Sequence, residues 1–518
     1  MDIQKLIYVN SNIYPYFTVC VCLIFFFFPS CRQETALERA LRLAGDNRQE
    51  LERVLLHYKD DSLKQEAARF LIENMPYHSY QEEFYRLSGG EKYRPKLSDF
   101  HTDNDCRKHL DSLASTGYMA ECRKFKDIQT LGYAFLVRNI DLAFKVWQKP
   151  WAQQVPFAIF CRYILPYRTS REYPSELREE MMEKFTSLLD SAGVVSPLEA
   201  CSVMNEKLRA VVKYKKSSLP FYPTIEETYA SGSSQCEGMC DLGLFIMRAA
   251  GIPVAMEQTV WTRMDLGHSW GAVWHDGRFH AFAPGGRAPG TYQQVLNSRG
   301  NLRPAKVYRS HFSPCLTHDK IGVDDDGCAI WLKSPLLEDV TAEYLNSTID
   351  IHIVTDCIKK FSKTSGQVYL CAYNYYKWTP VVMGNRTDSV CRFRQVGGDN
   401  IFIVADSPGM GQFRFLTPPF HVDVLGNVRK FVPCQERTST FTLSKIKGLF
   451  DRTYTLRYWD TETASFSPLE YSHATDSTQT YANIPENALL WFTVPDRIVN
   501  QRVFFIENDS VITMNLKR

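Results

Sequence analysis

The amino-acid sequence predicts a multidomain α+β protein with a helical N-terminal region, an α+β core and C-terminal β-sandwich domains. The chain has 518 residues, which is too long for one hydrophobic core of ordinary size. Apolar residues recur at spacings of three and four between positions 36 and about 215, which is the period of an amphipathic helix. After position 250, short apolar and aromatic runs are separated by turn signals, which is typical of strands.

Residues 1–30 are predicted to be a signal peptide. The segment 16–30, YFTVCVCLIFFFFPS, is uncharged and apolar, and the chain becomes polar directly after Cys31. The run Phe-Pro-Ser-Cys is similar to a loose bacterial lipobox, in which Cys31 carries the lipid. An uncleaved membrane anchor is the alternative, although the apolar run is shorter than the ~20 residues that a spanning helix needs. In both cases we expect an exported protein of the cell envelope, held to the membrane at the periplasm or the cell surface.

The helical region is expected over residues 32–194. The segment 61–75, DSLKQEAARFLIENM, begins at an Asp-Ser cap and continues with one apolar stripe. A later helix, predicted to begin the core, starts at Ser196 with Pro197 and Glu199 in its first turn.

The α+β core is expected over residues 195–315, and two β domains follow over 316–435 and 436–518. In the core, WHDGRF places Asp-Gly between two runs typical of strands, which is a strong hairpin signal. The aromatic stretch 373–380, YNYYKWTP, is interpreted as the core and edge of a strand. Stacking of its rings on sugars is the alternative interpretation.

Charge and cysteine usage exclude several classes of function. The formal net charge is +2, so the chain lacks the basic balance of a nucleic-acid-binding protein. The 15 cysteines contain no CxxC pair, and none stands beside histidines at zinc spacing. The acidic run 324–327, DDDG, is interpreted as a turn and not as a cation site. We therefore expect no metal and no cofactor.

The segment 231–240, SGSSQCEGMC, is the candidate nucleophile site. Small polar residues lead into a helix that begins near Cys236 and ends at Gly251. Backbone N–H groups and the positive dipole end favour a thiolate at a helix start, which is the state that a nucleophilic sulfur needs. The alternative is a structural cysteine at the top of a buried helix. Cys240, one turn deeper, is expected to pack.

A nucleophilic cysteine needs a base, and His268 is the first candidate. It follows Gly267 and opens the strand GHSWGAVW. His280, on the returning strand of the hairpin, is the second choice.

These segments occur in a recognisable order. Ser-Ser-Gln-Cys, a helix ending in RAAGIP, a strand, GHSW and a hairpin closing in AFAP resemble the transglutaminase-like superfamily, whose papain-type fold carries a Cys, His, Asp triad. The resemblance covers roughly residues 195–295 and implies Cys236 as nucleophile and His268 as base. The flanking regions resemble exported Bacteroidetes lipoproteins with a transglutaminase-like core, which implies an architecture and a compartment but no substrate.

The sequence departs from the family pattern at the third member of the triad. The family places an Asp just before a Pro at the end of the strand that follows the histidine, and here Ala283 occupies that position. Asp276 lies in the hairpin turn, and Arg287 stands in the next loop. Gln258 and Asn297 are candidates for orienting the imidazole by residue type alone. A cysteine depends less on such an acid than a serine does, because it is intrinsically more nucleophilic.

Three functions follow from this resemblance. The first is a cysteine hydrolase of peptidase or amidase type, in which the oxyanion is held by the Cys236 N–H together with Gln235. The second is an inactive descendant that binds glycan or protein through its β domains. The third is a cross-linking transglutaminase. The expected partners are a peptide, protein or glycan-linked substrate and a membrane reached through the lipid anchor, with no nucleic acid.

Overall fold

The computed structural model describes residues 34–216, 221–264, 266–291, 304–315, 331–354, 367–374, 377–387, 390–409, 412–444, 453–473, 478–493, 502–507 and 510–513. The predicted signal peptide with Cys31, the residue Asn297 and the acidic run 324–327 lie outside these ranges. Within the described ranges, no helix is long and apolar enough to cross a membrane. The same ranges hold no group of three or more His, Cys, Asp or Glu side chains that could bind a metal ion.

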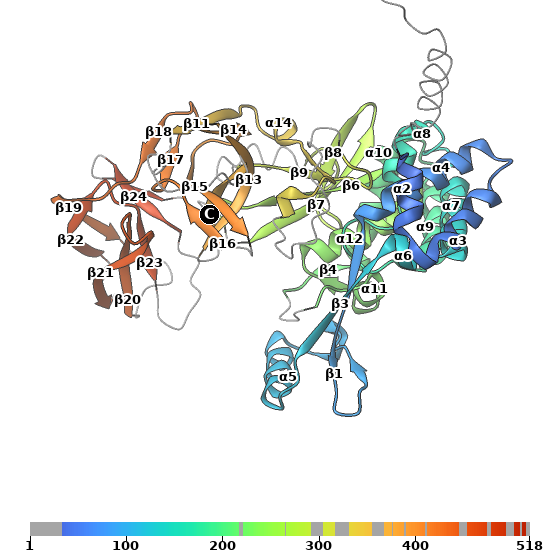
Figure 1. Ribbon diagram of the computed structural model, residues 1–518, viewed down its shortest axis with the longest axis horizontal. Coiled ribbons are helices and arrows are strands. Elements are labelled where there is room, and N and C mark those ends of the chain that lie inside the picture. Colours follow the sequence, from blue (N-terminus) through green and yellow to red (C-terminus); the bar gives the residue numbers. More distant parts are fainter. Residues whose placement is uncertain are drawn as a thin grey trace, which may run out of the picture.

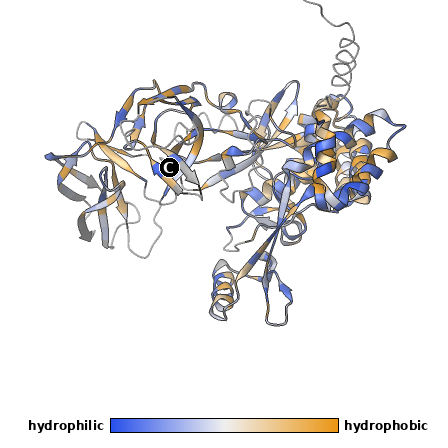
Figure 2. Ribbon diagram, in the orientation of Figure 1, coloured by the Kyte–Doolittle hydropathy of each residue, from blue (hydrophilic) through white to orange (hydrophobic). Residues whose placement is uncertain are grey.

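The N-terminal residues form a bundle of amphipathic helices. Figure 2 shows hydrophobic and hydrophilic positions alternating along them, as the three-and-four spacing predicts. Side-chain caps start several of these helices; Asp61, for example, accepts a hydrogen bond from the Lys64 N–H at 3.1 Å. The helices are α2 (Ala36–Leu43), α3 (Arg48–His57), α4 (Ser62–Asn74), α6 (Asp127–Thr130), α7 (Tyr133–Trp147), α8 (Phe157–Tyr163) and α9 (Arg178–Ala192).

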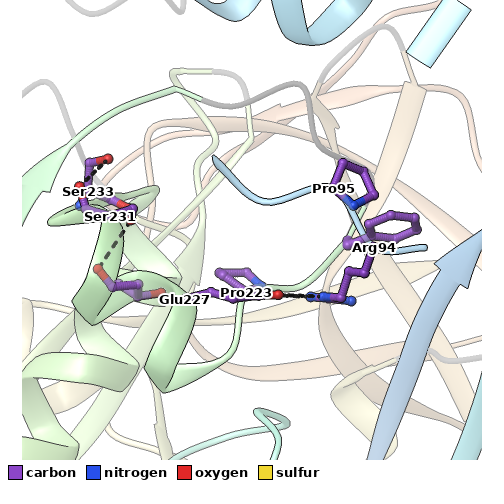
Figure 3. Close-up of a pocket in the computed structure, with 8 residues that line it drawn as sticks. Arg94, Pro95, Pro223, Glu227, Ser231 and Ser233 are labelled. Carbon is purple, nitrogen blue, oxygen red and sulfur yellow. Dashed lines mark hydrogen bonds and ion pairs between the residues drawn. The ribbon is translucent and has the colours of Figure 1, made fainter. Parts of the chain in front are cut away.

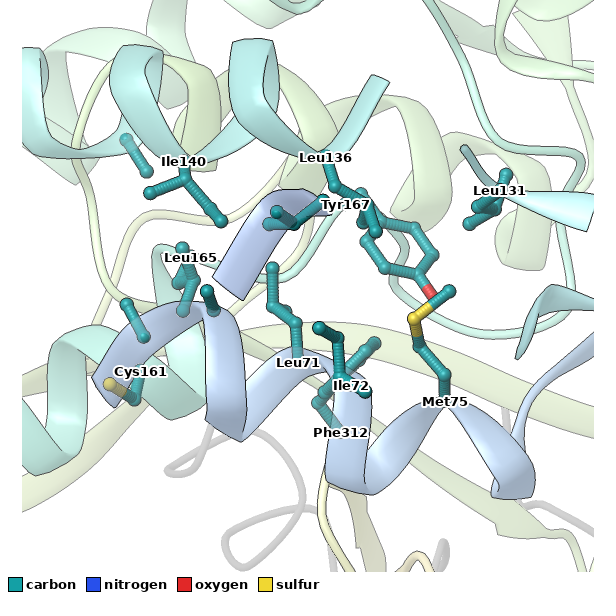
Figure 4. Packing of buried hydrophobic residues seen from close by; sticks show 14 of the residues in the cluster. Leu71, Ile72, Met75, Leu131, Leu136, Ile140, Cys161, Leu165, Tyr167 and Phe312 are labelled. Atoms are coloured by element: carbon teal, nitrogen blue, oxygen red, sulfur yellow. The ribbon is translucent and has the colours of Figure 1, made fainter. Parts of the chain in front are cut away.

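The bundle has its own core, and a residue from the next domain joins it. Leu71 and Ile72 of α4 are buried in one cluster with Leu136 and Ile140 of α7, as Figure 4 shows. Phe312, which follows more than 160 residues after α7, belongs to the same cluster. The bundle is therefore packed against the core domain and is not an independent lobe.

A three-stranded sheet interrupts the helical region, so the prediction of helices throughout 32–194 is wrong here. Its strand order is β2-β1-β3, and helix α5 accompanies it. Together they form an arm that projects from the body in Figure 1. The strand β1 reads SYQEEFYR, in which the helical and strand periods are hard to distinguish from sequence. The elements are β1 (Ser79–Arg86), β2 (Lys92–Tyr93), α5 (Asp103–Ser115) and β3 (Ala120–Lys126).

The α+β core combines helices with a five-stranded sheet of order β10-β9-β6-β7-β8. A short parallel pair, β4 with β5, precedes the central helix α12. The helices are α10 (Pro197–Val211), α11 (Ile225–Ser231) and α12 (Cys236–Ala249), with the short α14 (Thr341–Tyr344) beside the sheet. The strands are β4 (Lys213–Tyr214), β5 (Ser233–Ser234), β6 (Val254–Val260), β7 (Gly267–His275), β8 (Arg278–Phe282), β9 (Tyr308–Ser310) and β10 (Leu337–Asp339).

The two faces of this sheet bury different clusters. Val273 and Phe282 share an apolar cluster with α12, whereas Trp270 and Ala281 belong to a second cluster with Tyr344. This division follows from the two-residue alternation of side chains along β7 and β8.

The predicted hairpin joins β7 to β8. Asp276 has φ 48° and Gly277 has φ 78°, and His275 pairs with Arg278 across them. Positive φ at both central residues is the conformation that favours Asn-Gly and Asp-Gly in two-residue hairpins. The Asp-Gly signal therefore located this turn correctly.

The C-terminal half is built of β-sheets. The larger sheet has the order β11-β14-β13-β12-β15-β17-β18, with β16 paired to β15, and the second has the order β21-β20-β23-β24-β25. β19 pairs with β22. The strands are β11 (Ile349–Val354), β12 (Gln367–Asn374), β13 (Lys377–Thr387), β14 (Val390–Val396), β15 (Asn400–Gly409), β16 (Gln412–Phe415), β17 (Phe420–Val422), β18 (Val428–Lys430), β19 (Cys434–Ser444), β20 (Thr453–Asp460), β21 (Ser465–His473), β22 (Thr478–Glu486), β23 (Leu490–Thr493), β24 (Phe504–Glu507) and β25 (Ser510–Thr513).

An aromatic cluster joins the two larger C-terminal sheets. Tyr373 and Trp378 are 5% and 7% exposed, and they pack with Trp459, which comes from the other sheet. These rings of the stretch 373–380 therefore serve as core, as the first interpretation states, and they do not form an exposed stacking platform for sugars.

Candidate active site

Cys236 is the first residue of α12, where the chain turns from β5 into the helix. Gln235 is the N-cap residue, with extended backbone (φ −71°, ψ 170°). Its carbonyl accepts a hydrogen bond from the Met239 N–H at 2.9 Å. A Cβ at Gly238 would lie 2.2 Å from Ser234 Oγ and 3.1 Å from Pro223 Cγ. The incoming strand therefore packs directly on the first turn of the helix, and this contact places the cysteine.

Burial dominates the protonation of Cys236. It raises the pKa of the thiol above its ordinary value and the Glu237 carboxylate raises it further, while the N–H groups of Ser269, Glu237 and Cys236 lower the pKa by less than these two causes together. The N–H groups of Glu237 and Cys236 at the helix start lower the pKa, which is the direction that the sequence predicts, but the net shift is upward. The sulfur rests as a thiol at neutral pH.

His268 is the second residue of β7 and lies among tryptophans. Its Cα pairs with Thr259 across the sheet. The Trp261 ring stacks on the imidazole at a centroid distance of 5.8 Å and an angle of 20°, and the Trp270 ring lies 5.8 Å away at 37°. Burial lowers the pKa of His268 to about 4, so the imidazole is neutral at pH 7 and can accept a proton.

A main-chain group connects the two predicted residues. The Ser269 N–H, one residue after His268, acts on the Cys236 sulfur as a hydrogen-bond donor. Helix α12 and strand β7 therefore meet where each of them begins. The His268 ring, in contrast, shares its side of the sheet with Trp270, and α12 packs on the side of Val273.

The expected acid position holds an apolar contact. Ala283 follows directly after β8, and it packs with the cluster that contains Trp261 and Trp270. Its N–H donates to the Arg287 carbonyl at 3.0 Å. Because Gly271 pairs with Phe282, Ala283 is the next residue toward the His268 end of β7. The structure thus places residue 283 where a triad acid would be useful, but an alanine has no group to bind the imidazole.

A buried carboxylate does lie on the same side of the sheet as His268. Glu257 accepts hydrogen bonds from Arg309 Nε and Trp270 Nε1, each at 2.9 Å, and a third from the Tyr344 hydroxyl. The ion pair with Arg309 compensates the burial of both charges. Glu257 is thus used in a structural network that holds Trp270.

The remaining sequence candidates lie at different places. His280 pairs with Val273, five residues along β7 from His268, which is about 16 Å at the rise of a strand. The register therefore does not bring His280 to Cys236. An Asp276 carboxylate oxygen lies 3.3 Å from His275 Nε2 at that same far end of the hairpin. Gln258 pairs with Ser269, so its backbone lies opposite the residue that contacts the sulfur.

Sequence reasoning missed a polar cluster on the second turn of α12. The buried Asp241 accepts hydrogen bonds from the Tyr222 hydroxyl and from Ser170 Oγ, the latter at 3.2 Å. The Arg171 guanidinium lies 4.3 Å from the Tyr222 ring centroid and forms an ion pair with Glu237 at 3.5 Å. This cluster ties the start of α12 to the segment after α8. No local pattern signals it, because its members are far apart in the sequence.

A small pocket lies beside the turn that leads into α12 (Figure 3). Arg94 and Glu227 form an ion pair across it at 2.7 Å. Ser233, three residues before Cys236, is part of its lining, and the other lining residues are Pro95, Phe221, Pro223, Thr228 and Ser231. Residues of both the arm and the core thus line this pocket, which lies next to the candidate nucleophile.

Comparisons with known proteins agree with this geometry in one respect. Residues 188–284 match the model of the transglutaminase-like superfamily core, a range that includes Cys236, His268 and Ala283. No curated protein matches the chain. Among solved structures, a candidate cysteine protease from Cytophaga hutchinsonii matches at 16% identity and a TM-score of 0.20, over 24% of this chain and 45% of that one. The transglutaminase of red sea bream matches at 11% identity and a TM-score of 0.23, over 86% of this chain and 78% of that one.

Proposed function

We propose that the domain formed by residues 188–284, which match the core of the transglutaminase-like superfamily, is a cysteine hydrolase that cleaves amide bonds in the cell envelope. The observation that carries the proposal is the contact between α12 and β7. There the Cys236 sulfur accepts a hydrogen bond from the N–H of Ser269, the residue that follows His268. A thiol and a neutral imidazole are the two groups that general-base attack on a carbonyl requires, and the proposal needs the His268 ring to turn from the Trp270 side of β7 toward the sulfur.

The proposed reaction has two steps. In the first, the Cys236 sulfur bonds to the amide carbonyl carbon while the thiol proton passes to His268. The C–N bond then breaks, and the imidazolium returns the proton to the leaving amine. In the second, water attacks the thioester carbonyl carbon while His268 takes a proton from the water. The C–S bond then breaks as the imidazolium returns that proton to the sulfur, which releases a carboxylic acid and restores the thiol. The Cys236 N–H, unpaired within the helix because it lies in the first turn, and Gln235 are the proposed oxyanion donors.

Acylation of the sulfur tests the proposal without knowledge of the natural substrate. The full chain is treated with p-nitrophenyl acetate, and the acetyl group is located by mass spectrometry. We expect acetylation at Cys236 that falls at least about tenfold in His268→Ala. His280→Ala is the matched control, since it removes a histidine from the same sheet about 16 Å further along. Equal acetylation in the two variants would overturn the role of His268.

The same assay separates hydrolysis from transfer. If an added amine such as hydroxylamine or glycine methyl ester takes most of the acetyl group at low millimolar concentration, the domain is a transferase. We expect water to remain the main acceptor, which corresponds to a peptidase or amidase.

A specific observation favours a second function, that of an inactive scaffold which binds glycan or protein. Ala283 fills the acid position with an apolar contact. The raised thiol pKa and the lowered imidazole pKa also favour the neutral pair over the reactive ion pair. An absence of Cys236 acetylation in the assay, with the fold intact, would select this alternative.

The compartment and partners belong to the same proposal. The apolar segment 16–30 and Cys31 support export and lipid anchoring. A peptide, protein or glycan-linked substrate of the cell envelope is the partner that fits amide hydrolysis there. Metabolic labelling with a palmitate analogue, compared between wild type and Cys31→Ala, tests the anchor directly.

A further inference from the structure

The loop that connects β6 to β7 carries a ring that contacts His268. It starts at Trp261, which is 4% exposed and stacks on the imidazole. It closes at Leu266, whose carbonyl accepts a hydrogen bond from the Trp261 N–H at 3.1 Å. The next residue but one is His268 itself. Any movement of this loop therefore moves both the stacked tryptophan and the first residues of β7.

Leu266 has a backbone conformation that is unfavourable for a leucine. Its φ is +68°, a left-handed value that non-glycine residues rarely adopt. Its side chain is 55% exposed, so packing does not explain the conformation. A residue in this region persists only where surrounding contacts hold it.

Those contacts come from the C-terminal β-sandwich. Asn374 ends β12 and is 3% exposed. Its Oδ1 accepts a hydrogen bond from the Leu266 N–H at 2.8 Å, and its Nδ2 donates to the Leu266 carbonyl at 2.9 Å. Nδ2 also donates to the Trp261 carbonyl at 2.7 Å and lies 3.3 Å from the Met264 carbonyl. One amide side chain thus binds both ends of the loop, which requires an acceptor and donors in the same group.

Two other segments of the C-terminal half contact the same loop. Arg263 forms an ion pair with Asp399 at 2.6 Å. The Arg502 guanidinium donates to the Thr262 carbonyl at 2.5 Å. The loop is therefore bound from three separate segments of the C-terminal sheets and not by a single chance contact.

We infer that Asn374 is a positioning residue for His268: the C-terminal β-sandwich sets the place of the imidazole through Trp261 and Leu266, which Asn374 holds at the two ends of the loop. The inference rests on the proposed function in assigning His268 the role of base. Its structural part, the dependence of the His268 environment on Asn374, is independent of whether the domain is active.

The ionisation of His268 is the readout. The full chain is labelled with ¹³C-histidine, and the His268 signal is identified by its loss in His268→Gln. Burial lowers the pKa of His268 to about 4 in the intact site. In Asn374→Ala the loop is expected to release Trp261, so water reaches the imidazole and its pKa rises by at least about 1 toward the ordinary ~6.5.

A matched control separates positioning from general loss of stability. Asn139 is also buried and also donates to a main-chain carbonyl, that of Leu165 at 2.9 Å, but in the helical bundle. We expect Asn139→Ala to lower the melting temperature and to leave the pKa of His268 unchanged. An unchanged His268 pKa in folded Asn374→Ala would overturn the inference.

A rescue experiment tests the mechanism. Glycine adopts left-handed backbone without strain. In the double variant Asn374→Ala/Leu266→Gly, the pKa of His268 is therefore expected to fall back by at least half of the rise seen in Asn374→Ala. If Asn374→Ala does not fold, Asp399→Ala is used instead, because it removes a different contact to the same loop. The same rise in the pKa of His268 is expected in that variant.

Activity is read separately. A pKa change with no Cys236 acetylation in any form, wild type included, would retain the positioning role and reject the proposed hydrolase. Acetylation in the wild type with no pKa change in Asn374→Ala would retain the hydrolase and reject the positioning role.

Discussion

The Cys236 thiol is subject to two opposing influences on its pKa. The helix start and three N–H groups favour the thiolate, whereas burial and the Glu237 carboxylate together oppose it more strongly. Cys434 offers the opposite case in the same chain, because hydrogen bonding to the Arg437 side chain lowers its pKa in a partly exposed position. The position of a cysteine at a helix start therefore does not by itself decide how reactive its thiol is.

These directions predict an order of thiol reactivity. At pH 7, Cys434 should react with iodoacetamide faster than Cys236, because the thiolate is the reactive form. The Cys236 rate should keep rising as the pH passes through and above 9, while the Cys434 rate levels off at a lower pH. Site-resolved mass spectrometry between pH 6 and pH 10.5 measures both rates in one sample. A Cys236 rate that levels off below pH 8 would contradict the dominance of burial.

Residue 283 allows a second prediction at this scale. Ala283→Asp places a carboxylate on the side of the sheet where His268 lies, so it should raise the pKa of the imidazole and increase Cys236 acetylation about tenfold. It should also lower stability by roughly 2 kcal/mol, because the site is lined by Trp261 and Trp270. Ala281→Asp, on the same face, is the control. It should lose stability without any gain in acetylation, and a gain of equal size would rule out a specific effect.

At the level of elements, the contact between β5 and the first turn of α12 places the nucleophile. Gly238 allows this contact, because a Cβ there would lie 3.2 Å from Ser234 Cβ and 3.1 Å from Pro223 Cγ. Neither atom can move away by rotating a side chain. The helix therefore cannot accept a larger residue without shifting Cys236.

Gly238→Ala should accordingly lower the free energy of unfolding by about 1–3 kcal/mol and reduce Cys236 acetylation. Alanine favours a helix over glycine by up to about 1 kcal/mol, so the overpacking has to exceed that gain. Gly89→Ala is the control, since a Cβ at Gly89 meets no atom within 4 Å. Chemical denaturation and the acetylation assay measure the two effects. A stabilised Gly238→Ala protein with normal acetylation would show that the contact does not matter.

At the level of the whole molecule, the arm and the core meet beside the candidate site. Arg94 of the arm forms its ion pair with Glu227 of α11, and it also donates to the carbonyls of Glu83 and Tyr222. Tyr222 in turn bonds to Asp241 of α12. Arg94 and Tyr222 therefore link the arm to α12, the helix that begins at Cys236.

Arg94→Ala should release the arm without unfolding the body. We expect chymotrypsin to cut between residues 79 and 126 at least about fivefold faster, because local opening controls such cleavage. Arg86→Ala, which breaks the partly exposed pair with Glu121 inside the arm, is the control and should have a small effect. Equal cleavage of the two variants would show that Arg94 does not hold the arm.

Much of the core domain could be predicted from local pattern. The helix at Cys236, the strand at His268 and the turn at Asp276 and Gly277 each depend on neighbouring residues, and all three are found in the structure. The arm was missed because its strands occur within a helical context, where the helical and strand periods are hard to distinguish. The loop anchor was missed because Asn374 is more than 100 residues from Trp261, and no local signal links them.

The order of residues along the chain was enough to place a cysteine at a helix start and a histidine at a strand start, since capping, hydrophobic period and turn chemistry act over a few neighbours. Tertiary contacts decided the rest. Burial against α12 and the tryptophans, and not helix position, sets the protonation of Cys236 and His268. A distant sandwich residue holds the loop that stacks on the imidazole. Desolvation and long-range hydrogen bonds exist only once the chain has folded, and therefore the local pattern could not reveal them.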